Sequence, residues 1–197
     1  IALACYEGVD DRADAGRVLV SLGRVQRAHG QLPAALEYYR RAAAQQEAVD
    51  DYTGLIQSLN AQAVTYDRLG RFTTSERLYR RALTLSQQRK LERYEVFIQG
   101  NLGGSLLNAG HVAAGLRELQ AVLAREKSPF LRATRLRQIS EAWRELGEFD
   151  KALAALDEAA TAIASPSFDE RVSWLTAHAR VLARRGDLDL AQRDLDE

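Results

Sequence analysis

Two stretches of the sequence share a pattern, GQLPAALEYYRRA at residues 30–42 and GRFTTSERLYRRA at residues 70–82, and are nearly the same in their last residues. Each begins with glycine and ends with Tyr-Arg-Arg-Ala, and the second follows the first by 40 residues. A fixed period of this length is typical of proteins built from stacked structural repeats, in which each unit covers the apolar face of its neighbour. The pair therefore predicts a repeat architecture.

Five glycines extend this repeat along the chain, with spacings of 40, 40, 37 and 39 residues. A small residue stands five positions after each glycine, and a Tyr or Leu stands nine positions after it. Such agreement in register across five units indicates a structural repeat and not a bias of composition. The glycines are Gly30, Gly70, Gly110, Gly147 and Gly186, and the small residues are Ala35, Ser75, Gly115, Ala152 and Ala191.

Each unit has the pattern of two helices. Apolar residues before each glycine recur at helical spacing, as in Leu55, Leu59 and Ala63, and the pattern resumes after the glycine. Glycine suits a helix that ends in the left-handed conformation, and a small side chain lets two helix axes approach closely. The expected helix pairs are 12–29 with 33–49, 51–69 with 73–88, 91–109 with 112–126, 130–146 with 149–164, and 168–185 with 188–197.

This pattern predicts an all-α fold, a right-handed superhelical stack of antiparallel helical hairpins, or α-solenoid. Pro129 and Pro166 fall where helices would begin, and Ser128 and Ser165 are the expected N-caps. We expect a single domain over 1–197 with units of about 12–50, 51–90, 91–128, 129–166 and an incomplete 167–197.

The composition limits the classes of function. Lys and Arg total 27 and Asp and Glu total 27, so the zero net charge gives no support for binding nucleic acid or an anionic membrane. No apolar run is long enough to span a bilayer, and the one cysteine, Cys5, excludes an internal disulfide. We expect a cytoplasmic protein. Because the chain starts at Ile1 and contains no Met, we also expect a piece of something longer.

The repeat resembles the tetratricopeptide repeat family, whose pattern places a large residue, Leu-Gly, a small residue, an aromatic residue and a proline at fixed offsets. The first unit supplies Leu22-Gly23, Ala35 and Tyr39, and the third supplies Leu102-Gly103. The units are longer than the family's usual 34 residues, and the proline that ends a unit is absent. Units of about 40 residues resemble those of bacterial transcription-regulator sensor regions, quorum-peptide receptors and kinesin light chains.

This resemblance implies that the first helix of each pair lines a concave groove that holds a protein or peptide partner. Asn101 matches the family position whose amide holds a bound peptide backbone. Arginines outnumber acidic residues at the groove positions, so we expect an acidic partner, and the lysine arrangement that binds chaperone tails is missing. The expected binding residues are Arg24, Arg27, Asn60, Phe97, Asn101, Leu107, Arg137, Arg144 and Arg180.

The sequence contains no pattern typical of a catalytic or metal site, and we expect neither enzyme activity nor a cofactor. His29, His111 and His178 lack the spacing of metal ligands. The first two lie beside hairpin glycines, where exposure is expected. Trp143 and Trp174 fall on apolar helical stripes and are expected to pack in the core with a partly exposed edge.

Several functions stay open at this point. The leading hypothesis is a protein-interaction scaffold, which fits the sensor region of a bacterial transcription regulator. The alternative is self-association as a homodimer, because the apolar residues Ile1–Ala4 and the unfinished last unit leave both ends without a polar cap. Opposite charge balance supports head-to-tail contact: residues 51–100 carry eight basic and five acidic residues, and 151–197 carry six and nine. A small-ligand sensor is a further alternative.

Overall fold

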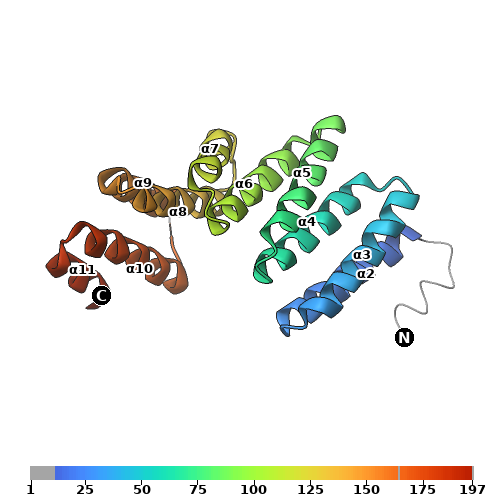
Figure 1. Ribbon diagram of the computed structural model, residues 1–197, viewed down its shortest axis with the longest axis horizontal. Helices are drawn as coiled ribbons and strands as arrows, with labels where there is room; N and C mark the ends of the chain where they lie inside the picture. Colours follow the sequence, from blue (N-terminus) through green and yellow to red (C-terminus); the bar gives the residue numbers. More distant parts are fainter. Residues whose placement is uncertain (1–11, 164, 197) are drawn as a thin grey trace. The chain divides into compact units, whose positions relative to one another are not determined.

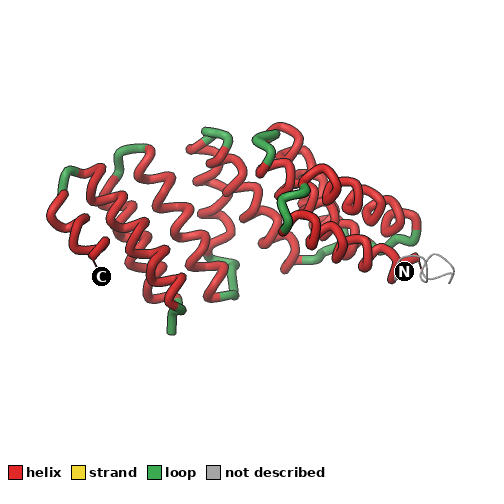
Figure 2. The backbone as a smooth tube through the Cα atoms, turned by 90° about the horizontal axis from the view of Figure 1, so that it is seen from below, coloured by secondary structure: helices red, strands yellow, loops and turns green. Residues whose placement is uncertain are grey.

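The computed structural model describes residues 12–163 and 165–196, and every regular element in these ranges is an α-helix (Figures 1 and 2). This confirms the predicted class, and each helix begins and ends within three residues of its expected bounds. No helix in the described ranges is both long and apolar enough to cross a bilayer. The helices are α2 (Arg12–Ala28), α3 (Leu32–Ala48), α4 (Tyr52–Arg68), α5 (Phe72–Gln88), α6 (Glu92–Asn108), α7 (Val112–Leu123), α8 (Pro129–Glu145), α9 (Phe149–Ala162), α10 (Phe168–Arg185) and α11 (Leu188–Asp196).

The described residues form two compact units, which we call unit 1 (residues 12–108) and unit 2 (residues 109–196). Unit 1 contains α2–α6, and unit 2 contains α7–α11. Within each unit, consecutive helices pack against one another. One continuous solenoid over 1–197 stays a prediction. Cys5 and the apolar segment 1–4 lie outside the described residues.

The repeat glycines adopt the left-handed conformation predicted for them, with φ between 69° and 103°. At the end of α2, the N–H of Gly30 donates to the carbonyl of Arg27, and the N–H of Gln31 donates to that of Gln26. This pairing satisfies carbonyls that the end of the helix leaves without partners. A Cβ added at Gly30 would meet no neighbouring atom. Backbone conformation, not packing, therefore requires glycine there.

The links between hairpins in unit 1 use the same conformation without glycine. Asp50 and Lys90, which follow α3 and α5, have φ values of 57° and 55°. The next residues complete the same hydrogen-bond pattern, with the N–H of Asp51 donating to the carbonyl of Gln46. Side chains other than glycine are strained in this region of φ. These short links keep each hairpin close to the next.

The core of unit 1 contains one fully buried tyrosine from each hairpin, Tyr39 in α3 and Tyr79 in α5. The ring of Tyr39 lies against α2 at Gly23, where an added Cβ would come within 2.5 Å of Cε1. Gly23 therefore makes room for an aromatic ring from the following helix, which is a physical reason for the Leu-Gly element of the repeat.

The small residues five positions after each glycine are buried in both units, as predicted. Short side chains at these points let the second helix of a pair lie close to its neighbours. The buried positions are Ala35, Ser75, Gly115, Ala152 and Ala191.

In unit 2, α8 begins as predicted. Pro129 is its first residue, and the Oγ of Ser128 accepts a hydrogen bond from the N–H of Leu131 at 3.3 Å. A serine cap followed by proline stabilises the first turn, where proline's missing N–H costs nothing.

The predicted start of α10 was wrong in its cap. Ser165 and Pro166 lie in the link before the helix, and the N-cap is Ser167. Its Oγ accepts from the N–H of Glu170 at 3.3 Å, and the Glu170 carboxylate accepts from the N–H of Ser167 at 2.6 Å. This reciprocal pair is a capping box, for which the spacing from Ser167 to Glu170 is the signature.

Both tryptophans pack in the core of unit 2 with part of each ring exposed, as predicted. They lie against a buried cluster of Ala152, Leu156 and Val181. The indole Nε1 of Trp174 donates to the carbonyl of Leu156 at 2.8 Å. This bond satisfies the polar end of the indole and fixes the orientation of the ring.

Candidate functional site

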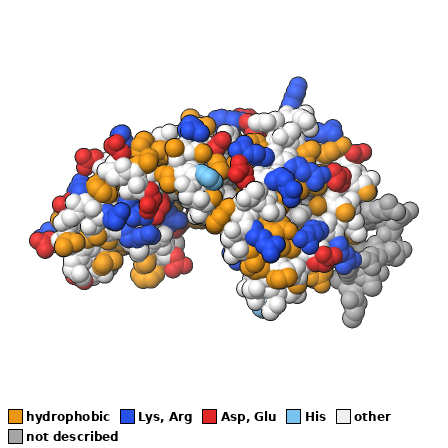
Figure 3. All heavy atoms as spheres, in the orientation of Figure 1, with side chains coloured by type: hydrophobic (Ala, Val, Ile, Leu, Met, Phe, Trp, Pro, Cys, Tyr) orange, Lys and Arg blue, Asp and Glu red, His pale blue; other side chains and the backbone are white. Residues whose placement is uncertain are grey.

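A groove in unit 1 is lined only by α2, α4 and α6, the first helices of the predicted pairs, and has a volume of about 190 Å³. These helices pack in order, α2 against α4 and α4 against α6. Figure 3 shows Lys and Arg side chains interleaved with hydrophobic ones on the visible face of unit 1. The lining residues are Val20, Arg24 and Arg27 of α2, Ile56, Gln57, Asn60 and Ala61 of α4, and Tyr94, Phe97 and Ile98 of α6.

Two side-chain hydrogen bonds join α4 to α6 at the groove. Nδ2 of Asn101 donates to Oδ1 of Asn60 at 2.9 Å, and Nε2 of Gln57 donates to the hydroxyl of Tyr94 at 2.8 Å. These bonds hold polar groups that can both donate and accept at the surface of the groove. A peptide backbone needs such groups, because each of its residues carries one donor and one acceptor.

The α2 side of the groove is positively charged. Arg24 and Arg27 stand one helical turn apart, and Nη2 of Arg24 donates to Oγ of Ser21 at 3.3 Å. Burial raises the pKa of the Tyr39 hydroxyl, and the charges of Arg27 and Arg24 oppose that rise. The Arg27 guanidinium is near enough to act on this pKa as a hydrogen-bond donor, but within the described part of the chain the buried hydroxyl has no partner of good hydrogen-bond geometry. The residues that line the groove include no carboxylate that could pair with Arg24 or Arg27.

The equivalent place in the second hairpin has its own carboxylate. Asp67 stands three residues before Gly70, as Arg27 stands three before Gly30. The hydroxyl of Tyr79 donates to Oδ2 of Asp67 at 3.2 Å, and Oγ of Ser105 donates to Oδ1 at 2.7 Å. Asp67 is thus held by the protein's own hydroxyls, and the charge at this position of the repeat changes from positive in α2 to negative in α4.

In unit 2, the predicted binding arginines already contact groups of the chain. Arg144 pairs with Glu141 and with Glu145, each at 2.5 Å, and only 11% of its side chain is exposed. These carboxylates raise the pKa of Arg144. Arg180 lies 3.5 Å from Glu141, and Arg137 donates to the hydroxyl of Ser173. A partner's carboxylate would have to compete with these contacts.

The structure brings together four of the nine predicted binding residues, Arg24, Arg27, Asn60 and Phe97, and joins Asn101 to them through Asn60. Leu107 is on α6 but does not line the groove, and the three arginines of unit 2 belong to the other unit.

Sequence reasoning missed the aromatic ring of Tyr94 and the apolar Ile56 and Ile98. The spacing could have identified Tyr94, because it precedes Phe97 by three residues and so lies on the same face of the helix. Ile56 and Ile98 are buried, and as members of the core pattern they gave no separate sign of lining a groove.

The histidines show no metal arrangement. His29 and His111 are exposed, as expected, and Nδ1 of His178 lies 2.6 Å from Oδ2 of Asp194, with its ring stacked on Trp174. Among the residues that the structure describes, no three His, Cys, Asp or Glu side chains gather as metal ligands would.

Comparison with known proteins shows a similarity between the first part of the chain and a repeat family. Residues 14–88 match the model of the tetratricopeptide repeat. No curated protein sequence matches the chain significantly.

Solved structures share the fold at low sequence identity. BtubC (BKLC) from P. vanneervenii is 17% identical with a TM-score of 0.81, over 98% of this chain and 82% of that one. The nearly identical TPR-like repeats assigned to a kinesin light chain of Podosopora anserina are 18% identical with a TM-score of 0.76, over 95% and 94%. A Rap protein, solved in complex with Competence and Sporulation Factor, is 19% identical with a TM-score of 0.78, over 90% of this chain and 51% of Rap. These likenesses confirm the predicted solenoid class.

Proposed function

Because residues 14–88 are tetratricopeptide repeats, we propose that the chain is a protein-interaction scaffold whose groove on α2, α4 and α6 binds an acidic peptide segment. The observation that carries this proposal is that Arg24 and Arg27 both line the groove, whereas none of its lining residues is an Asp or Glu. A carboxylate bound there would accept charge-assisted hydrogen bonds from the two guanidinium groups.

The rest of the groove suits the remainder of a peptide. The amides of Asn60 and Asn101 lie between the basic side and the aromatic side, where a backbone could bind them. Phe97 and Tyr94 are half-buried and offer an apolar surface for one large side chain. The expected ligand is therefore a segment with an Asp or Glu followed or preceded by an aromatic or branched aliphatic residue.

This proposal gives the chain no chemistry of its own, and neither nucleic acid nor membrane is the expected partner. The charge at the groove comes from two arginines, whereas the sequence as a whole has zero net charge. A regulatory role in a bacterial cytoplasm is the finer form of the proposal. It is supported by the fold shared with a Rap protein that was solved in complex with Competence and Sporulation Factor.

A peptide library selected on the chain tests the proposal and requires no identified partner. We expect enriched peptides to carry an acidic and a large apolar residue and to be lost on the double variant Arg24→Ala/Arg27→Ala. The variant Arg77→Ala removes an exposed arginine of α5, outside the groove, and should keep them. Enrichment of peptides without acidic residues, or equal binding to the double variant, would refute the proposal.

A second candidate function, self-association, is favoured by the exposed apolar residues of α11. Leu188 is 66% exposed and Leu195 61% exposed on a helix of nine residues. Burying them against a second copy would remove apolar surface from water. Light scattering over a dilution series tests this alternative. A dimer that dissociates in the variant Leu188→Ser/Leu195→Ser would support it, and a monomer at high concentration would exclude it.

A further inference from the structure

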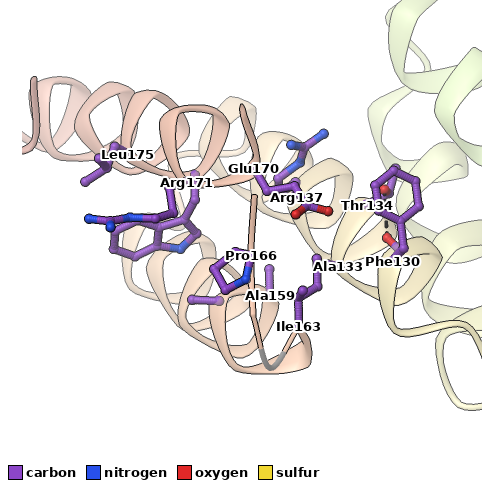
Figure 4. A pocket seen from close by; sticks show the side chains of 12 residues that line it. Phe130, Ala133, Thr134, Arg137, Ala159, Ile163, Pro166, Glu170, Arg171 and Leu175 are labelled. Atoms are coloured by element: carbon purple, nitrogen blue, oxygen red, sulfur yellow. Dashed lines mark hydrogen bonds between the residues drawn. The ribbon is translucent and has the colours of Figure 1, made fainter. Parts of the chain in front are cut away.

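A second concave site lies wholly within unit 2, among α8, the end of α9 and the start of α10, and encloses about 190 Å³ (Figure 4). Its apolar surface comes from Ala133, Ala159, Ile163, Trp174 and the ring of Phe130. Phe130 is 58% exposed at the edge, which is high for an aromatic side chain. The groove of unit 1 contributes nothing to this pocket, so it is a separate candidate site.

The link between α9 and α10 differs from the links in unit 1 and contributes Ile163 and Pro166 to the pocket. In unit 1, the left-handed Asp50 turns the chain directly from α3 into α4. After α9, the chain instead continues in extended conformation at Ile163 and reaches the cap of α10 at Ser167 through Pro166. Residues from the end of α9 and from the first turn of α10 both line the pocket. Alanine side chains on α8 and α9 do not fill it.

The wall of the pocket is preformed. Trp174 is held by its hydrogen bond to the carbonyl of Leu156 at 2.8 Å and by stacking on His178, with ring centroids 4.8 Å apart. A ring fixed in this way gives up little conformational freedom when a ligand packs on it.

Three charged side chains border this apolar surface: Arg137, Glu170 and Arg171. Figure 4 shows Glu170 and Arg137 close together and Arg171 apart from them, toward Leu175. Arg137 donates to Ser173, and its charge helps to lower the pKa of Glu170. The Glu170 carboxylate accepts from the N–H of Ser167 in the capping box. The border thus has a net charge of plus one, and Arg171, exposed on α10, is the cation placed to bind an anion.

We propose that this pocket binds a small carboxylate that carries one aromatic ring or one branched aliphatic group. The size argues for this class, since a closed apolar cavity of about 150 Å³ holds a benzene ring. The charge argues for an acid, because the ring would cover Trp174 and Phe130 while its carboxylate reaches Arg171. Arg137 adds a second positive charge that offsets Glu170.

Trp174 reports on this site directly by fluorescence. In a Trp143→Phe background it is the one remaining tryptophan of the sequence. The probes are phenylpropanoate and its uncharged counterpart phenylpropanamide. We expect saturable quenching or shifting of Trp174 emission, with the acid binding about tenfold more tightly than the amide, as one charge-assisted hydrogen bond would give.

Two variants separate the apolar and the charged parts of the proposal. Ala160→Leu fills the pocket from an exposed position and should abolish binding of both probes. Arg171→Gln should remove the preference for the acid and leave amide binding unchanged, whereas Arg184→Gln, on the same helix outside the pocket, should change neither. Unaltered binding in Ala160→Leu, equal affinity for acid and amide, or no saturation by either probe would overturn the proposal.

Discussion

Nδ2 of Asn101 donates a hydrogen bond to Oδ1 of Asn60 over 2.9 Å, and this bond joins α6 to α4 beside the groove of unit 1. The two residues are 41 positions apart in the sequence, which is about one repeat. The amide assigned to peptide binding by its place in the repeat is therefore held by a second amide that lines the groove. The pair gives the first prediction.

Asn101→Ala should weaken binding of a library-selected acidic peptide by about tenfold, because one well-placed hydrogen bond is lost and Asn60 loses its orientation. The salt dependence of binding should stay as in the wild type, since no charge is removed. Isothermal titration at two salt concentrations measures both quantities. Asn108→Ala, an exposed amide at the end of the same helix, is the control. An affinity unchanged by Asn101→Ala would contradict the role of this amide.

The two core tyrosines should respond differently to loss of the hydroxyl. Tyr79→Phe removes a donor to Asp67 and should lower the free energy of unfolding by about 1–2 kcal/mol. Tyr39→Phe removes a buried hydroxyl without a partner in the described chain, and should change stability by less than about 0.5 kcal/mol or raise it. Urea unfolding of both variants measures the difference. Equal losses would mean that the Tyr39 hydroxyl has an acceptor in solution.

A close helix contact at Gly23 and the left-handed Lys90 predict one loss and one gain of stability. Gly23→Ala should destabilise by about 1–3 kcal/mol, because its Cβ would overlap the ring of the buried Tyr39. Lys90→Gly should stabilise by up to about 1 kcal/mol, because Lys90 has a φ of 55° that glycine adopts without strain. Urea midpoints test both. A Gly23→Ala variant as stable as the wild type would refute the close packing of α2 on Tyr39.

The capping box of α10 predicts a pH dependence. Hydrogen bonds from the backbone and side chain of Ser167 hold the pKa of Glu170 below its ordinary value of 4.5. A carboxyl whose pKa is lower in the folded state stabilises the fold fully above that ordinary value, and the contribution disappears as the pH falls through the lowered pKa. Glu170→Gln should therefore melt below the wild type at neutral pH, and the gap should close in acid.

Asp169→Asn is the matched control for Glu170→Gln, since it removes a carboxylate from the same first turn without touching the capping box. Thermal melting from neutral to acidic pH compares the variants. A gap that stays constant as the pH falls would show that the ionised Glu170 contributes nothing to the cap.

The fold could be predicted from the sequence because the same backbone and packing requirements recur in successive units. The left-handed glycines, the small residues after them and the core tyrosines are each required by local backbone or packing, so they appear at fixed offsets. Asp50 and Lys90 escaped prediction because they adopt the same conformation as the glycines at a cost in strain, and their side chains give no sign of it. The N-cap of α10 was predicted at Ser165 because a serine directly before a proline also fits the start of a helix. The spacing from Ser167 to Glu170 is the signature of a capping box and identifies the correct residue.

The site could be predicted only in part. The repeat register placed Arg24, Arg27, Asn60 and Phe97 on inner helices, and they line one groove. The register carried no information on which arginines pair within the chain. Arg144 pairs with Glu141, which precedes it by three residues on the same helix, and with Glu145, the residue that follows it. Helical spacing predicts the pair with Glu141, so the sequence alone contains a reason to expect Arg144 to be paired within the chain.

The central claim is that Arg24 and Arg27 bind a carboxylate of a peptide partner, and a double-mutant cycle tests it most directly. One axis is the change Arg24→Ala/Arg27→Ala in the chain, and the other replaces the acidic residue of a selected peptide by its amide. We predict that each change alone weakens binding about tenfold or more, and that making both costs little beyond either one. Losses that simply add, with no coupling between the arginines and the peptide's carboxylate, would contradict the account.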